Sequence, residues 1–136
     1  RSQRRSTPSN LVTRPPVPAP IGGYYSNCVR VRAGSMLFIS GQIGTDLKGN
    51  VVSKDAAPQA EQALRNIELL LKANGATMAD VVKVTVYVTD IRCLDEIAPI
   101  RMKYFPENGP ASAIVEVSRL ALPELKVEIE AIAAVD

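Results

Sequence analysis

Hydrophobic positions between residues 60 and 71 recur every three or four residues, which is the spacing of one face of an α-helix. They are Ala60, Ala63, Leu64, Ile67, Leu70 and Leu71. Asp55 and Pro58 suit the start of this helix, and Gly75 suits its end. A second helix is predicted over residues 94–105, where the apolar positions recur with a less regular period.

Runs of β-branched and alternating residues predict strands around these helices. The run Val81–Val88 is β-branched and alternates with Lys83, Thr85 and Tyr87, as in a strand whose second face is partly covered. Four further strand-like runs lie at residues 29–31, 36–40, 111–117 and 126–135. Ala33-Gly34-Ser35 separates the first two of these runs and predicts a hairpin turn.

The resulting order, β-β-α-β-α-β-β, predicts an α+β domain with two helices on one face of a mixed sheet. A short additional strand at the N-terminal side gives the predicted sheet six strands. Its opposite face still carries apolar side chains that need a cover, which predicts an oligomer. Residues 21–136 are expected to form this domain, after an arm at residues 1–20 whose Arg, Ser and Pro content predicts an extended or disordered segment.

Composition narrows the class of protein. The chain has 136 residues, of which 46% are hydrophobic and 22% charged, as is typical of one soluble globular domain. No apolar run is long enough to cross a bilayer and no secretory signal precedes Gly22, so a cytoplasmic protein is expected. The net charge is +2, and all six charged residues before Asp46 are basic. Without interleaved aromatic residues this basic stretch is more typical of a solvated tail than of a nucleic-acid site.

The chain contains no histidine and two cysteines. The absence of histidine excludes Ser-His-Asp and Cys-His catalysis and removes the commonest transition-metal ligand. Cys28 and Cys93 form no CxxC pair, so they indicate buried free thiols rather than a zinc site or a thioredoxin-type motif. Proton transfer is left to Asp, Glu, Lys, Tyr and Cys side chains.

Three motifs, read together and in order, resemble the RidA family, also called YjgF or L-PSP. They are Ile39-Ser40-Gly41-Gln42-Ile43-Gly44, Ala63-Leu64-Arg65-Asn66-Ile67 and Val127-Glu128-Ile129-Glu130-Ala131-Ile132-Ala133. The resemblance extends over residues 21–135. It implies a chorismate-mutase-like fold and a homotrimer whose sheets face inward around a barrel, with a small-molecule pocket at each subunit interface. It also implies hydrolysis of reactive enamines and imines to a keto acid and ammonia, without metal or cofactor. Ribonuclease labels have also been attached to this family.

The resemblance supplies five candidate site residues. Glu128 matches the carboxylate that orients the attacking water, and Ser40 of the Ser-Gly-Gln turn is expected to act beside it. Tyr24, Gln42 and Ser112 are expected to bind substrate. Three of these residues also have structural interpretations. Tyr24 could stack in an interface, Ser40 could bond to the backbone near Gly41, and Glu128 could lie on a solvated face.

Ser112 and Ala98 depart from the family pattern. In active members an arginine follows Pro-Ala at the position of Ser112 and binds the substrate carboxylate with two parallel N–H donors. Active members usually carry an asparagine at the position of Ala98. Since a charged hydrogen bond contributes about 1.5–3 kcal/mol, Ser112 predicts weaker carboxylate binding and a substrate other than 2-aminoacrylate. A non-enzymatic trimer that binds a metabolite or a protein partner is the alternative. Possible replacement cations, all expected at the surface, are Arg101, Lys103 and Arg119.

Overall fold

A computed structural model of the chain describes residues 18–20, 23–32, 34–105 and 107–135. Its helices and strands are β1 (Ser35–Ile43), α1 (Ala56–Ala73), β2 (Val81–Val88), α2 (Leu94–Tyr104), β3 (Ala111–Glu116) and β4 (Val127–Val135). Short 3-10 turns at Met78–Asp80 and Ile91–Cys93 precede β2 and α2. Both helices and these four strands lie where the sequence pattern predicts them.

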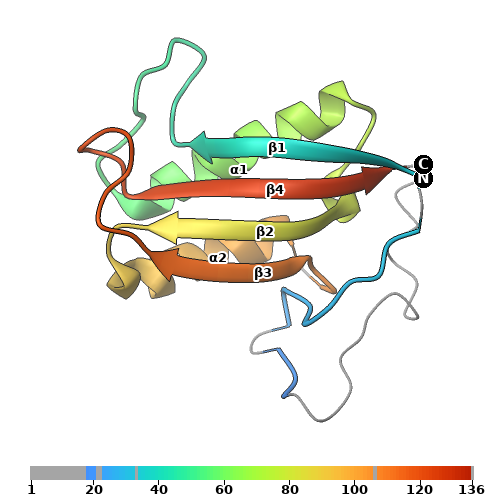
Figure 1. The fold of residues 1–136 in the computed structure, drawn as a ribbon. Helices are drawn as coiled ribbons and strands as arrows, with labels where there is room; N and C mark the ends of the chain where they lie inside the picture. The colour runs from blue at the N-terminus through green and yellow to red at the C-terminus, as the bar shows by residue number, and fades with distance from the viewer. Residues whose placement is uncertain (1–17, 21–22, 33, 106, 136) are drawn as a thin grey trace.

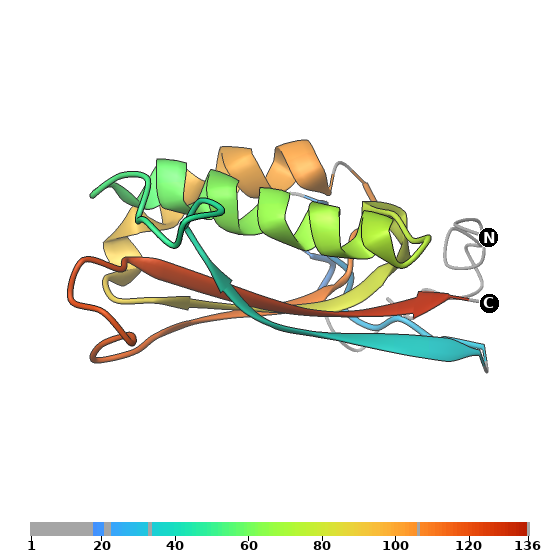
Figure 2. The ribbon, with the colours of Figure 1, turned by 90° about the horizontal axis from the view of Figure 1, so that it is seen from above.

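The four strands form one mixed sheet in the order β1-β4-β2-β3 (Figure 1). Strand β4 pairs antiparallel with β1 and with β2, whereas β3 runs parallel to β2. Both helices pack on the same face of this sheet, and neither covers the other face (Figure 2). The predicted α+β class, with two helices on one face of a mixed sheet, is therefore confirmed.

The sheet contains fewer strands than predicted. Among the described residues it has four strands rather than six, and the element order is β-α-β-α-β-β. Val29 and Val31 lie outside its strands, in a segment that passes from the edge at β3 toward the start of β1 (Figure 1). Ser26 of this segment makes an isolated parallel bridge to Ala111. The predicted hairpin turn includes Ala33, which lies outside the described residues, as does most of the predicted N-terminal arm.

The hydrophobic core fills the space between the helices and the sheet. Helix α1 contributes its predicted apolar stripe except for Leu70, which is exposed. Strands β2 and β4 contribute alternate residues, so that their remaining side chains lie on the face without helices. The central core residues are Leu64, Ile67, Leu71, Val84, Val86, Val88, Ile97, Val127, Ile129 and Ala131. None of the helices in the described residues is long and apolar enough to span a membrane.

A buried glutamine fixes the start of β4. Gln59 of α1 is fully buried, and its Nε2 donates to the carbonyl groups of Ser53 at 2.8 Å and Glu124 at 2.9 Å. Its Oε1 accepts a hydrogen bond of 2.7 Å from the backbone N–H of Lys126. One side chain thus satisfies three backbone groups and holds the chain two residues before Glu128.

Candidate functional site

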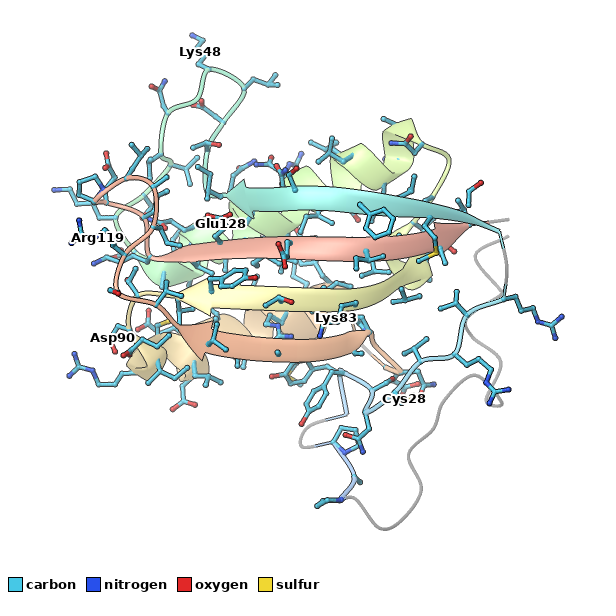
Figure 3. The ribbon with its side chains drawn as sticks, in the orientation of Figure 1. Cys28, Lys48, Lys83, Asp90, Arg119 and Glu128 are labelled. Atoms are coloured by element: carbon cyan, nitrogen blue, oxygen red, sulfur yellow. The ribbon has the colours of Figure 1, made fainter. Side chains whose placement is uncertain are left out.

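Acidic side chains of β4 lie on the face of the sheet that the helices leave open. Val127 and Ile129 point into the core, whereas Glu128 and Glu130 point the other way. Figure 3 shows Glu128 on this open face, between β1 and β2. The predicted alternation of β4 is confirmed, and Glu128 faces the side where a further copy or a ligand can approach.

The carboxyl group of Glu128 lies directly against the backbone of β1 at Gly41. A Cβ atom added to Gly41 would come within 2.7 Å of Cδ and 2.9 Å of Cγ of Glu128, and closer still to Oε2. The register of β1 against β4 shifts between Ile39 and Gln42, so that Ser40 and Gly41 form a β-bulge. The missing side chain at Gly41 therefore creates a slot, and Glu128 occupies it.

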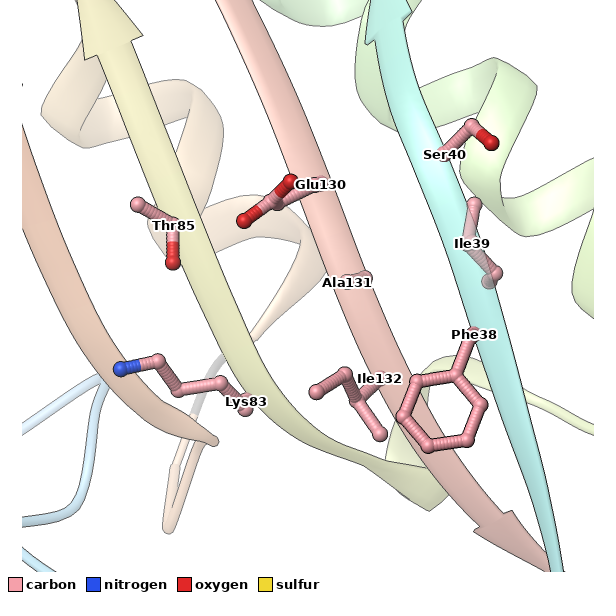
Figure 4. A pocket seen from close by; sticks show the side chains of 8 residues that line it. All are labelled: Phe38, Ile39, Ser40, Lys83, Thr85, Glu130, Ala131 and Ile132. Carbon is pink, nitrogen blue, oxygen red and sulfur yellow. The ribbon is translucent and has the colours of Figure 1, made fainter.

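Ser40 and Gln42 flank this slot. The side chain of Gln42 donates to the carbonyl group of Ser40 at 3.1 Å, and no described residue bonds to the Ser40 hydroxyl. Ser40 also lines a shallow hollow of about 310 Å³ on the open face, together with Phe38, Lys83 and Glu130 (Figure 4). Ser40 thus lies on the open face with Glu130. Gln42 pairs with the core residue Ile129 and lies beside Leu70 of α1, so it does not share the face of Glu128.

The two carboxylates of β4 differ in their partners. Glu130 accepts a hydrogen bond of 3.0 Å from the hydroxyl of Tyr87, and this bond raises the pKa of Tyr87 above its usual value. Glu128 accepts no hydrogen bond from any side chain among the described residues. Because its oxygens keep their acceptor capacity, Glu128 is the better placed of the two to bind a water molecule.

A second group of side chains, here called the arginine corner, consists of Tyr24, Arg101 and Ser112. Arg101 of α2 is only 4% exposed, and its Nη2 donates to Oγ of Ser112 at 2.5 Å. Its Cζ lies 5.2 Å from the centre of the Tyr24 ring, the geometry of a cation–π contact. Burial lowers the pKa of Arg101 from its usual value, while Tyr24 and Tyr25 act in the opposite direction.

The prediction that Arg101 lies at the surface was wrong. Arg101 follows Ile97 by four residues, so it shares the buried face of α2 and points toward the sheet. Ser112 pairs with the core residue Val84 and therefore faces the same helix. The helical spacing from Ile97 was the signal that could have revealed this contact. Lys103 is exposed, as predicted, and pairs with Glu61 at 2.9 Å.

Hydrogen bonds at the start of β3 hold Tyr24 in the arginine corner. The backbone N–H of Ser26 donates to the carbonyl of Pro110 at 3.0 Å, and the Ser26 hydroxyl donates to the carbonyl of Gly109 at 2.6 Å. A Cβ atom at Gly109 would collide with the backbone carbonyl group of Tyr24. The absence of a side chain at Gly109 therefore lets the segment around Tyr24 pack closely beside β3 and Ser112.

The five sequence-predicted residues do not converge within one chain. Ser40 lies on edge strand β1 and Ser112 on edge strand β3, three strand spacings away, or roughly 14 Å. Ser112 points to the helix side, whereas Glu128 points to the open side. A small molecule cannot contact both groups in a single copy. The residues that sequence analysis missed are Gly41 as the slot and Arg101 as a buried cation.

The two cysteines differ in their surroundings. Cys93 is buried, as predicted, and desolvation raises the pKa of its thiol. Cys28 is exposed, so the expectation of two buried thiols was wrong for this residue. It lies in the segment that crosses the end of the sheet and is not covered by a helix. Among the described residues, no group of three or more acidic or cysteine side chains is placed to hold a metal ion.

Comparison with known proteins gives consistent matches along the chain. A family model described as Endoribonuclease L-PSP matches residues 16–135. A RutC family protein of Pyrococcus horikoshii is 44% identical over 117 residues, which cover 85% of this chain and 90% of the relative. A 2-iminobutanoate/2-iminopropanoate deaminase of Salmonella typhimurium is 38% identical over 128 residues, covering 92% and 97% of the two chains. A crystal structure of a Rid family protein of unknown function from Yersinia pestis matches with a TM-score of 0.77 at 35% identity, covering 88% and 97%.

Proposed function

Because the chain belongs to the RidA family, to which the Endoribonuclease L-PSP model corresponds, we propose that it hydrolyses a small imine or enamine to a keto acid and ammonia. Relatives named as 2-iminobutanoate/2-iminopropanoate deaminases, 37–38% identical, align with 92% of its length. The observation that carries the proposal is the carboxylate of Glu128, held in the slot at Gly41 and free of side-chain partners.

The proposed reaction needs a positioned water more than a strong nucleophile, because an imine carbon is already electrophilic. Glu128 accepts a proton from the water as the oxygen bonds to this carbon. The electron pair of the C=N bond moves to the nitrogen, which takes up a proton. The carbinolamine then loses ammonia as the C–N bond breaks and the C=O bond forms. One water is consumed, one ammonia is released, and no atom changes its oxidation state by electron transfer.

In this proposal the working unit is a homotrimer with its sites between subunits. Met36 and Phe38 are exposed on the open face, and 75% of Phe38 is accessible in the single chain. A second copy covering this face removes that apolar surface from water. It also offers a route for the arginine corner of one chain to approach Glu128 of another, since the two groups are too far apart within one chain.

The assembly is tested with Phe38→Asp. Size-exclusion chromatography with light scattering should give the parent protein three times the 14.6 kDa of one chain, and the variant the mass of one chain. Leu47→Asp, in the exposed loop after β1, is the matched control and should leave the mass unchanged. A parent protein that runs as a monomer at assay concentration would remove the proposed trimer.

The reaction is tested with an imine generated in place by an amino-acid oxidase acting on 2-aminobutanoate. Semicarbazide traps the imine, so an active chain should increase free 2-oxobutanoate and lower the rate of semicarbazone formation. Glu128→Gln keeps the shape of the side chain but not its basicity, and should lower kcat by about 100-fold or more. Glu130→Gln, on the same strand and face, should retain activity. Equal turnover by Glu128→Gln and the parent would exclude the proposed role, and an inactive parent would favour a binding protein.

A further inference from the structure

A buried cation without a counter-ion lies in the arginine corner. Arg101 is 4% exposed, and charged side chains buried to this degree are normally paired with an opposite charge. Among the described residues its side-chain partners are the hydroxyl of Ser112, the ring of Tyr24 and the nearby Tyr25, none of which carries a full negative charge. No carboxylate among the described residues forms an ion pair with it. Within the described part of the chain, the corner therefore lacks an anion.

We propose that Arg101 binds the carboxylate of the substrate, so that the arginine corner recognises small 2-imino and 2-oxo acids; this inference rests on the proposed function. A guanidinium group has five N–H donors in one plane and binds a carboxylate through two of them. Ser112 accepts a hydrogen bond from Nη2 alone, which leaves donors on Nη1 and Nε. Ser112 then positions the arginine instead of replacing it.

Two residues predicted to bind substrate hold Arg101 from different parts of the chain. Ser112 bonds to its guanidinium from β3, and Tyr24 contacts it from the segment that packs beside Gly109. Tyr24 lies in a segment without helix or strand, so it is the part of the corner that yields when a ligand enters. The three side chains come from α2, β3 and the segment before β1, so the fold rather than a local motif builds the corner.

The other cations named above are less suited to this role. Lys103 is exposed and already pairs with Glu61. Arg119 is exposed in the connection between β3 and β4. Lys83 lines the hollow on the open face, where Glu130 also lies (Figure 4). Of these cations in the described part of the chain, Arg101 alone combines burial, a fixed position and the absence of an acidic partner.

The binding test uses 2-oxobutanoate, the stable product of the assay reaction, and isothermal titration calorimetry. The parent should bind this acid more tightly than 2-oxobutanamide, its neutral counterpart. Arg101→Met should weaken binding of the acid by about 10- to 150-fold and leave the amide unaffected, whereas Arg101→Lys should lie between. An Arg101→Met protein that binds the acid as tightly as the parent would overturn the inference.

Two further variants separate binding from structural support. Ser112→Arg in the Arg101→Met background returns a guanidinium from the strand side and should restore part of the lost affinity, which no loss of packing at Arg101 would allow. Ser112→Asp places a carboxylate beside Arg101 and should abolish binding of 2-oxobutanoate while the thermal midpoint stays equal or rises. Full affinity in a folded Ser112→Asp protein would contradict the proposal. This test does not depend on whether the Arg101→Met protein folds.

Binding and turnover distinguish failure of this inference from failure of the proposed function. If the parent binds 2-oxobutanoate through Arg101 but releases no ammonia, the carboxylate site is supported and the deaminase activity is excluded. If the parent hydrolyses the imine and Arg101→Met has the same KM and kcat, the deaminase activity is supported and the carboxylate site at Arg101 is excluded. If both proposals hold, Arg101→Met raises KM, whereas Glu128→Gln lowers kcat.

Discussion

Gly41→Ala tests whether the slot in β1 sets the position of Glu128. The added Cβ would lie 2.7 Å from Cδ of Glu128, whereas ordinary contact begins at 3.4 Å, so the carboxyl carbon must move by at least 0.7 Å. Since a displacement of about 1 Å at a reacting group can cost about 100-fold in rate, we expect kcat to fall by about 10- to 100-fold. The free energy of unfolding should stay unchanged or rise by about 0.5–1 kcal/mol, because alanine is more favourable in a strand than glycine. The atoms that must move belong to the end of the flexible Glu128 side chain, so their displacement costs little.

The assay combines semicarbazide competition for the rate with urea unfolding for stability. The same substitution in a Glu128→Gln background is the control. If Gly41 acts only by making room for Glu128, the double variant should be no slower than Glu128→Gln alone. A further loss of similar size in the double variant would refute this account, because it would give Gly41 a role of its own. A fall in stability that parallels the fall in rate would show instead that the slot serves packing.

Three further predictions concern the assembly, the core and the loss of stability at low pH. At a substrate concentration well below the KM of Arg101→Met, coexpression of Arg101→Met and Glu128→Gln chains should return activity to roughly one quarter of the sites, since each proposed site takes one residue from each of two neighbours. Mixed assemblies without activity would contradict this. Gln59→Leu removes the hydrogen-bond partner of three partly buried backbone groups. At about 0.5–1.5 kcal/mol for each lost bond, the free energy of unfolding in urea should fall by about 1.5–4.5 kcal/mol, and an unchanged value would exclude the bridging role. Hydrogen bonds from Arg92 lower the pKa of Asp90 from 3.8 to about 2, so its stabilising effect is present above pH 4 and is lost as the pH falls toward 2. Asp90→Asn should remove that dependence, and an Asp90 pKa near 4 by NMR titration would contradict it.

Helix α1 and strand β2 follow from local sequence because their periods are clear. Val81–Val88 alternates over its full length, and the buried positions of α1 recur as on one helix face. The run at residues 29–31 holds two apolar residues separated by Arg30, which gives too little apolar surface to fix a strand. Tertiary bonds from Ser26 to Gly109 and Pro110 determine the path of this segment instead.

The candidate site was predictable for the residues that belong to a motif and not for those defined by packing. Glu128 alternates with core residues, so its direction could be predicted from β4 alone. Arg101 was expected at the surface because arginine is usually exposed, and the weak period of α2 did not outweigh that rule. Its burial depends on Ser112 and Tyr24, which only the fold brings near α2.

The central place of β4 in the sheet has a consequence for how the chain folds during synthesis. Strand β4 is the last described element to leave the ribosome, yet it pairs with both β1 and β2. Ser35 pairs with Val135, so these contacts join the first and the last strand of the sheet. Such long-range pairing slows folding, and β1 has no partner strand and exposes its apolar side chains until β4 has been synthesised. A nascent chain that stops before β4 therefore exposes a strand that is prone to aggregation. It also lacks Glu128, so it has none of the proposed activity.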